Sequence, residues 1–542
     1  MNRKMISLLL ALILASGTLA SCGNPKDPAE TAGTESENAT DTTPVETEPE
    51  TVRYAAEVPD GTDLGGRKFT VLAFAAEDVV WNDVDWNATE LTGEVLNDAV
   101  YTRTKNTEDL LNVEIDVEHV SARGNTSALT NSVKANDDAY QLFNGIIQGT
   151  FSLGQSGYLA ELNDFAAQGT LRLDSPWWDQ NALADLSINH KNYAITGDIG
   201  TMYKKSIGVI MFNKAIHADY DLEDPYTLMD EGAWTIDKMV EMGAQVSEDL
   251  NGDGVMDEND RYGLICFCDM MGLAMIGCDV RFATKNDADI PELTMLSEKS
   301  VSVMEKLATL MYDENLTYSW SAANKSEETA FAMYKQDQSL FYYGELHAVA
   351  TMREMDSPFG IMPMPLYDSE QDGYHHCINP NVAAVYTIPV TNTAYTETGY
   401  ILDTLGAESK NLLTPAYYNT TLIGKVTRDE ESARSLDVII STVRYDIGYL
   451  AGLNMSSLLY SMANARQTNL ASQYEKRANS FQIPRQAGRR LYCGVRRERG
   501  TGGGGDDCQN LFEKKVPTPP KTFEKIEEIE VEQVQICFIS TV

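Results

Sequence analysis

The sequence predicts an α/β fold of two lobes, and three observations support this. The chain has 542 residues, which is too long for one simple domain and suits two lobes or more. Its composition, with 43% hydrophobic and 9% aromatic residues, is that of a globular protein. Short β-rich runs alternate with helical patterns, an order that implies parallel sheets with helices on their faces.

The first lobe is expected mainly within residues 66–205, from a strand–helix–strand–helix–strand order. Ligands of such sheets bind at the carboxyl ends of the strands, so the residues that follow each strand are candidate contacts. The first strand comes after a glycine pair, and the second alternates polar and apolar residues. The expected strands are 68–74, 113–117 and 142–147, and the expected helices are 93–111 and 127–134.

The second lobe is expected mainly within residues 206–335, with later segments crossing between the lobes. Thr235 is the predicted N-cap of a helix, with Asp237 in its favourable first turn, and Trp234 before it is expected in the core. The other expected helices are 297–312, 327–335, 395–405 and 429–443, and the expected strands are 207–212, 339–343, 360–362 and 382–388.

Five stretches, in this order and spacing over residues 66–480, resemble the extracellular solute-binding lipoproteins of ABC importers, the type 1 relatives of maltose-binding protein. That resemblance implies a periplasmic-binding-protein-like fold, with two lobes joined by crossover strands, a hinge and an interlobe ligand cleft. It also implies sugar transport through ABC permease transmembrane subunits, without chemistry on the ligand. The matching stretches are 155–162, 212–214, 232–235, 359–365 and 414–418.

The N-terminus has the layout of a secretory signal peptide. Arg3 and Lys4 precede an apolar run that is too short to span a bilayer with polar flanks. Residues 19–22, Leu-Ala-Ser-Cys, resemble the lipobox of bacterial lipoproteins, which implies that Cys22 carries a diacylglyceryl group and acyl chains such as palmitate. We expect the lipoprotein signal peptide, 1–22, to be cleaved before Cys22, which is retained with its lipid, and the protein to be a lipid-anchored, extracytoplasmic component of the bacterial cell membrane. The alternative is an ordinary cleaved signal peptide.

The segments on either side of the body differ from it in composition. Residues 23–52 hold seven Thr, four Pro and eight acids and are predicted to be a disordered tether. Residues 483–542 cluster Arg, then Gly and Pro, and hold three of the eight Cys. This tail is predicted to be a frameshift artefact, with a basic interaction tail as the alternative. The two-lobed body is therefore 53–482.

Residues 249–260 match a 12-residue calcium loop. Oxygen ligands stand at positions 1, 3, 5, 7, 9 and 12, and Gly254 permits the sharp turn. Position 12 is Asp rather than the usual Glu, which leaves bidentate coordination open. An Asp/Gly-rich surface turn is the alternative. The predicted ligands of a structural calcium ion are Asp249, Asn251, Asp253, the carbonyl of Val255, Asp257 and Asp260.

A sugar site needs aromatic platforms together with side chains that donate and accept hydrogen bonds. Tryptophans in polar loops and polar or aromatic residues at strand ends meet that need, although packing within a lobe is the alternative for each. The candidate ligand contacts are Asp78, Trp81, Trp86, Gln148, Trp177, Trp178, Asp198, Trp320 and Tyr343.

Charge excludes one class of partner and leaves two other functions open. The net charge of −39 excludes nucleic-acid binding, which needs a basic surface. Residues 1–22 carry +2, residues 23–52 carry −7 and residues 483–542 carry +1, so −35 lies on the body. Such a body could attract a cationic peptide or polyamine. A cell-surface carbohydrate-active enzyme with a calcium-stabilised domain is the other alternative to an oligosaccharide-binding importer component.

Overall fold

The computed structural model describes residues 53–75, 85–121, 125–418, 430–451 and 455–477. The predictions for the signal peptide, Cys22, the tether and the tail lie outside these residues, as do those for Asp78 and Trp81.

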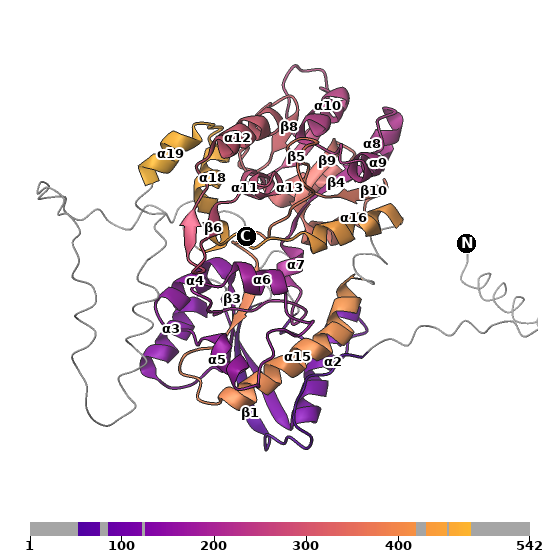
Figure 1. Ribbon diagram of the computed structural model, residues 1–542. Coiled ribbons are helices and arrows are strands. Elements are labelled where there is room, and N and C mark those ends of the chain that lie inside the picture. The colour runs from indigo at the N-terminus through magenta and orange to yellow at the C-terminus, as the bar shows by residue number, and fades with distance from the viewer. Residues whose placement is uncertain (1–52, 76–84, 122–124, 419–429, 452–454, 478–542) are drawn as a thin grey trace, which may run out of the picture. The chain divides into compact units, whose positions relative to one another are not determined.

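A four-stranded sheet, in the order β11-β3-β1-β2, forms the first lobe (Figure 1). Strand β1 is parallel to β2 and β3, and β11 joins antiparallel to β3 from much later in the chain. Both faces of β1 are buried, because Phe69 and Val71 belong to one apolar cluster and Leu72 to another. The strands are β1 (Arg67–Phe74), β2 (Val113–Val120), β3 (Leu142–Ile146) and β11 (Ala384–Thr387).

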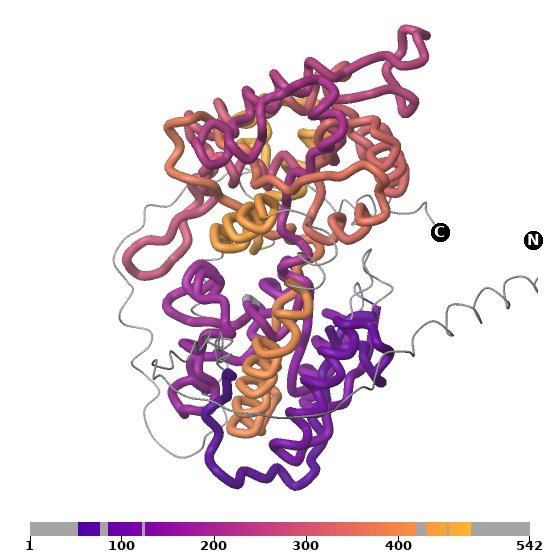
Figure 2. Tube along the Cα trace, turned by 90° about the vertical axis from the view of Figure 1, so that its right-hand side faces the viewer, coloured from indigo at the N-terminus to yellow at the C-terminus, as the bar shows by residue number. Residues whose placement is uncertain are grey.

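Helices cover this sheet as the alternation predicted. The two longest, α2 and α15, pack along each other although they are far apart in sequence (Figures 1 and 2). Helix α2 begins at Glu94, whose side chain accepts the amide of Asn97. The helices of the first lobe are α2 (Val95–Leu111), α3 (Asn125–Ala135), α4 (Ile147–Gln155), α5 (Leu162–Ala167), α6 (Gln180–Asp185), α7 (Met202–Lys205) and α15 (Tyr395–Pro415).

A five-stranded sheet, in the order β10-β4-β9-β5-β8, forms the second lobe. Strand β5 is parallel to β8 and β9, whereas β4 is antiparallel to β9 and β10. The carboxyl ends of β5, β8 and β9 therefore lie at the same edge of the sheet. The strands are β4 (Gly208–Asn213), β5 (Tyr262–Cys266), β8 (Thr317–Ser319), β9 (Ser339–Glu345) and β10 (Phe359–Met362).

Several helices of the second lobe begin with side-chain caps, those of α8, α9, α10, α12, α13 and α17. Thr235 accepts the amide of Lys238 at the start of α10, and Trp234 is fully buried with its indole donating to the carbonyl of Pro363, so both predictions are confirmed. These helices are α8 (Lys214–Asp219), α9 (Pro225–Asp230), α10 (Ile236–Val246), α11 (Met270–Gly277), α12 (Glu298–Met311), α13 (Glu327–Lys335), α14 (Leu346–Met352), α16 (Glu430–Ser441), α17 (Ile447–Leu450), α18 (Met455–Asn464) and α19 (Leu470–Arg477).

Two chain segments that run between the lobes pair with each other. Ile207 forms an antiparallel bridge with Ile378, and the amide of Asn379 donates to the carbonyl of Ser206 at 2.9 Å. We call residues 206–207 and 378–379 the crossover pair. A small antiparallel hairpin, β6 (Ala283–Lys285) with β7 (Pro291–Leu293), stands apart from both sheets.

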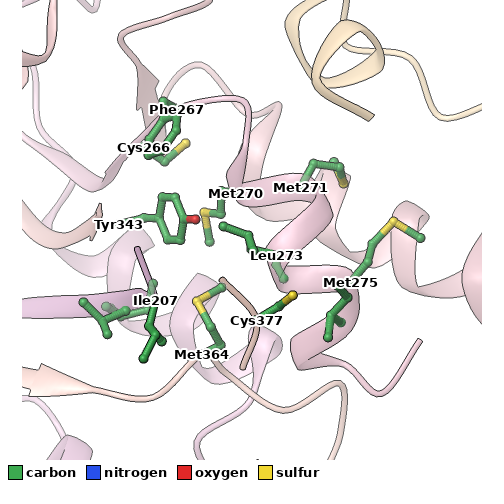
Figure 3. Packing of buried hydrophobic residues seen from close by; sticks show 14 of the residues in the cluster. Ile207, Cys266, Phe267, Met270, Met271, Leu273, Met275, Tyr343, Met364 and Cys377 are labelled. Carbon is green, nitrogen blue, oxygen red and sulfur yellow. The ribbon is translucent and has the colours of Figure 1, made fainter. Parts of the chain in front are cut away.

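The core of the second lobe is rich in sulfur. Figure 3 shows Tyr343 with its ring directed at Met270, and Met364 and Cys377 lie in the same cluster. The four cysteines of the described residues, Cys266, Cys268, Cys278 and Cys377, are buried and free. Unbranched thioethers fill irregular space around α11, which explains how a helix composed of buried residues can pack on every side.

Candidate functional site

The common carboxyl-end edge of β5, β8 and β9 gathers polar and aromatic side chains. Strand β5 is followed by Phe267 and Asp269, strand β8 by Trp320, and strand β9 ends on Glu345. We call this group, with Asn379 of the crossover pair, the second-lobe edge. Because parallel strands end together, residues from distant parts of the sequence meet here.

Aromatic rings form a stack at the second-lobe edge. Trp320 is partly exposed and stacks on Phe267, with ring centroids 5.3 Å apart and an interplanar angle of 30°. Phe267 in turn lies 5.3 Å from Tyr343, which is fully buried beneath it (Figure 3). Of the two predicted contacts in this region, Trp320 thus lies at the surface of the edge and Tyr343 supports it from the core.

One amide joins two carboxylates at the same edge. Asn379 Nδ2 donates to Asp269 Oδ2 at 3.0 Å and to Glu345 Oε1 at 2.8 Å. Desolvation by burial raises the pKa of Asp269, and it raises the pKa of Glu345 well above its ordinary value, with the negative charges of Glu327 and Asp269 adding to the effect. His347 lies 3.4 Å from Glu345 and 3.5 Å from Glu327. The carboxylate oxygens can accept hydrogen bonds from a polar group, and a cationic group would stabilise the ionised forms that burial and neighbouring charge disfavour.

Gln148 reaches the second lobe from the carboxyl end of β3. Its Nε2 donates to Ser456 Oγ at 3.2 Å. Ser456 belongs to α18, which packs on α11, and Asp269 is the N-cap residue of α11. The predicted strand-end residue of the first lobe thus contacts a helix that borders the second-lobe edge.

Trp177 and Trp178 lie in the core of the first lobe. Both indole nitrogens donate to Asp403 Oδ1 at 3.2 Å, and the residues are only 5% and 3% exposed. Burial raises the pKa of Asp403 to about 6 despite these bonds. We call the three residues the indole clamp. The structure assigns the two indoles to packing within this lobe, away from the second-lobe edge.

Trp86 and Asp198 also have partners within the first lobe. Trp86 is 5% exposed, with the guanidinium of Arg103 4.9 Å from its ring centroid. Asp198 binds Lys204 at 3.0 Å and Lys410 at 3.1 Å, and accepts from Thr414 at 2.6 Å. Burial alone would raise the pKa of Asp198, but these cations and the hydroxyl together lower it. Trp86 thus packs against α2, and Asp198 joins α7 to α15.

The predicted calcium loop has turns of the required kind. Gly252 and Gly254 have φ of +74° and +79°. Asp249 accepts the amides of both glycines, and these bonds lower the pKa of its carboxyl. Fully buried Asp260 accepts the amides of Leu250 and Asp257. Carboxylate oxygens of this kind are the ligands that a hard cation prefers. In the structure, those of Asp249 and Asp260 accept hydrogen bonds from backbone amides. Within the described residues, no three His, Cys, Asp or Glu side chains come together as a metal site.

Sequence reasoning missed four residues of the second-lobe edge, namely Phe267, Asp269, Glu345 and Asn379. The predicted strand at 339–343 stops two residues before Glu345, because the glycine at 344 interrupts the apolar run. Strand β5 was not predicted, so the residues that follow it were not considered. Extending the predicted strand 339–343 to its end would have found Glu345. Phe267 and Asp269 needed a prediction of β5, and Asn379 reaches the edge only through the crossover pair.

The fold can be compared with known structures. No family model and no curated protein matches the sequence. A sugar transporter of Rhizobium etli in an open conformation is 12% identical, with a TM-score of 0.52 over 76% of this chain and 98% of that one. A family 1 extracellular solute-binding protein of Bifidobacterium longum subsp. infantis is 14% identical, with a TM-score of 0.50 over 77% and 98%. An ABC substrate-binding protein of Listeria monocytogenes in complex with cycloalternan is 12% identical, with a TM-score of 0.50 over 77% and 98%.

These matches extend over nearly the whole length of each known protein, and all three are described as transport or binding proteins rather than enzymes. None of the described helices has both the length and the apolar character to cross a bilayer. Together with the two α/β sheets and the crossover pair, the matches show that this chain has the two-lobed fold of the family 1 extracellular solute-binding proteins.

Proposed function

We propose that the protein is the substrate-binding component of an ABC importer, which captures an extracellular solute and delivers it to permease transmembrane subunits. The observation that carries the proposal is the second-lobe edge, where groups able to bind a ligand meet beside the segments that join the lobes. Domain closure around a ligand is the common motion of such folds. The ligand is released unchanged.

The solute we propose is an oligosaccharide. Sugars present apolar C–H faces to aromatic rings and hydroxyls to carboxylates and amides. Trp320, stacked on Phe267, supplies the first kind of surface, and Asp269 with Asn379 supplies the second. A protein of the same fold in complex with cycloalternan supports this solute class.

Calorimetry with the whole chain tests the proposal. The panel holds linear and cyclic glucose oligosaccharides, monosaccharides, short peptides and spermidine. We expect binding of an oligosaccharide, a loss of at least tenfold in affinity for Trp320→Leu, and a smaller loss for Trp320→Phe, which keeps an aromatic face. Binding that is indifferent to both substitutions would place the site elsewhere, and hydrolysis of a bound glycan would replace the importer with a carbohydrate-active enzyme.

A cationic peptide or polyamine is the second candidate, because one specific observation favours it. Asp269 and Glu345 share a single amide donor, and Glu327 adds a third carboxylate nearby. A protonated amine would offset this charge, as it would the −35 of the body. Spermidine binding that weakens steeply with salt, without any sugar binding, would favour this solute over an oligosaccharide.

For the location of the protein, we propose a lipid anchor on Cys22 at the outer face of the bacterial cell membrane. The n-region, the apolar run and the lipobox-like residues before Cys22 support it. Labelled palmitate should be incorporated by the wild-type chain and not by Cys22→Ser, and the variant should leave the membrane fraction. Equal labelling of both chains would contradict the anchor.

We also propose that loop 249–260 binds a structural calcium ion. The six oxygen positions in register and the left-handed backbone of Gly252 and Gly254 support it. After chelation, titration with calcium chloride should give a dissociation constant on the order of 10⁻⁴–10⁻³ M. Asp253→Ala should abolish this binding, whereas Asp287→Ala, an equal charge change on the exposed tip of the hairpin, should not. No heat with the wild-type chain would reduce the loop to a surface turn.

A further inference from the structure

The hairpin β6–β7 is fixed at its base to the second lobe. The amide of Phe282 donates to Asp446 Oδ2 at 2.8 Å, and its ring stacks on Tyr449 with centroids 5.3 Å apart. Thr294, just after β7, donates its amide to the carbonyl of Phe282 at 2.9 Å. A Cβ on Gly448 would lie only 2.7 Å from the backbone of Phe282, so α17 packs directly against the base. The hairpin therefore moves with the second lobe.

The tip of the hairpin binds the first lobe through a lysine. Lys285 Nζ donates to the carbonyl of Ala184 at 2.5 Å and to Ser187 Oγ at 2.8 Å. It also pairs with Asp289 at 3.0 Å, and the two side chains are only 18% and 13% exposed. A partly buried pair held by further hydrogen bonds is screened less by water than a pair on the open surface.

Asp289 binds the same segment of the first lobe with three more hydrogen bonds. Its Oδ2 accepts from Ser187 Oγ and from the amide of His190, each at 2.8 Å. Its backbone carbonyl accepts the amide of Asn189 at 2.8 Å. Two successive amides thus face one acidic residue, an arrangement that forms a small anion-binding concavity.

The first-lobe turn is shaped to present those amides. Ile188 and Lys191 bond to each other in both directions across Asn189 and His190. The two central residues have φ of 55° and 61°, and neither is glycine. Left-handed backbone at a non-glycine residue is unfavourable and persists where the surroundings demand it. Here Asp289 stabilises the left-handed conformation, because it accepts hydrogen bonds from the amides of both Asn189 and His190.

Residues 443–445 supply other contacts between the lobes. Val443 forms a β-bridge with His376, and His376 stands two residues before Ile378 of the crossover pair. The carbonyl of Val443 accepts a hydrogen bond from Asn181 Nδ2 of the first lobe at 3.3 Å. Tyr445, two residues further, donates its hydroxyl to Asp179 at 2.7 Å. The next residue, Asp446, binds the base of the hairpin through the amide of Phe282. Because displacement in a rotation grows with distance from the axis, the hairpin tip travels farther than these residues when the lobes separate about the crossover pair.

We propose that the hairpin β6–β7 is a latch between the lobes, whose bonds from Lys285 and Asp289 to residues 184–190 hold the lobes in contact and break when the lobes part. Hydrogen bonds with short optimal distances cannot follow a large displacement. The latch sets how readily the lobes part, whatever solute lies between them.

The test compares Asp289→Ala with Asp287→Ala in the full chain without solute. Asp287 lies on the same tip, is exposed and carries the same charge. Hydrogen exchange of a peptide that contains Asn189 and His190 should be at least tenfold faster in Asp289→Ala and unchanged in Asp287→Ala. Small-angle scattering should give a larger radius of gyration for Asp289→Ala alone.

Two results would overturn the latch. Equal exchange in both variants would mean that the tip contact is not formed in solution, and faster exchange without a change in radius would mean that the contact does not hold the lobes. Thermal unfolding of both variants checks that each is folded, and Ser187→Ala repeats the test from the first lobe. A further arm, which rests on the proposed function, adds the solute and expects faster release from Asp289→Ala. If no solute binds, the solute-free arms still decide the latch.

Discussion

The indole clamp of the first lobe and the second-lobe edge use tryptophan in opposite ways. Trp177 and Trp178 direct both indole N–H groups at Asp403 and are buried. Trp320 stacks one face on Phe267 and remains partly exposed. All three stand in polar loops in the sequence. The difference teaches that the exposure of the ring in the folded chain, more than the loop around it in the sequence, separates a packing tryptophan from a candidate platform.

The largest effect is expected from removing the acceptor of the clamp. Asp403→Ala leaves two buried indole donors without a partner, and each costs about 1–3 kcal/mol, so the free energy of unfolding should fall by about 3 kcal/mol or more. Asp403→Asn keeps a carbonyl oxygen and should lose much less. Urea unfolding of both variants measures the difference. Equal losses would show that Asp403 does not act as the shared acceptor.

At the second-lobe edge, the matching change is Asn379→Ala. The side-chain amide of Asn379 lowers the pKa of both Asp269 and Glu345 against the effect of burial. Loss of this amide therefore raises the pKa of both acids, because their ionised forms lose a hydrogen-bond donor. We expect a loss of about 2 kcal/mol at pH 7.5 and a smaller one at pH 5, where more of each acid is neutral. Unfolding at the two pH values measures this, and a pH-independent loss would contradict it.

The pH response of the clamp isolates Asp403. Its pKa is about 6 in the folded chain, against an ordinary value of 3.8. The folded state therefore binds the proton more tightly, and the ionisation penalty is absent below about 3.8 and complete above about 6. In Asp403→Asn this penalty is missing, so wild type should lose about 2 kcal/mol relative to the variant between pH 4 and pH 7. Parallel stability curves for the two chains would disprove the raised pKa.

The smallest effect on stability is expected at the platform. Trp320→Leu removes a partly exposed ring, and the indole nitrogen of Trp320 has no hydrogen-bond partner among the described residues. We therefore expect the free energy of unfolding to fall by about 1 kcal/mol or less. Its consequence should be a weaker affinity for the solute. A loss as large as that of Asp403→Ala would make Trp320 a packing residue and remove the contrast between the two regions.

Local patterns predicted much of the fold. The elements 327–335 and 68–74 agree with α13 and β1 to within one residue, because apolar period and cap residues decide them. Trp234 was placed in the core correctly, since it precedes an N-cap. The antiparallel pairing of β11 with β3 was not predicted, because strand partners distant in sequence leave no local signal.

The candidate site was less predictable for the same physical reason. Trp320 was found as a tryptophan in a polar loop and Tyr343 as an aromatic residue at a strand end, but only the folded chain separates the exposed ring from the buried one. Asp403 is ordinary in its helix and becomes informative when two indoles from another segment meet it. Residues that act through tertiary partners thus escape a reading of sequence alone.

Asn379 belongs to the crossover pair and also to the second-lobe edge, and this double membership sets an order of events. A residue beside a pivot sweeps a small arc, so its bonds to Asp269 and Glu345 survive when the lobes part. We therefore expect half of the site to stay assembled on the second lobe in the open protein. The solute would then be captured in two steps. It would first bind the preformed surface of the second lobe without any movement of the lobes, and the lobes would then close around it.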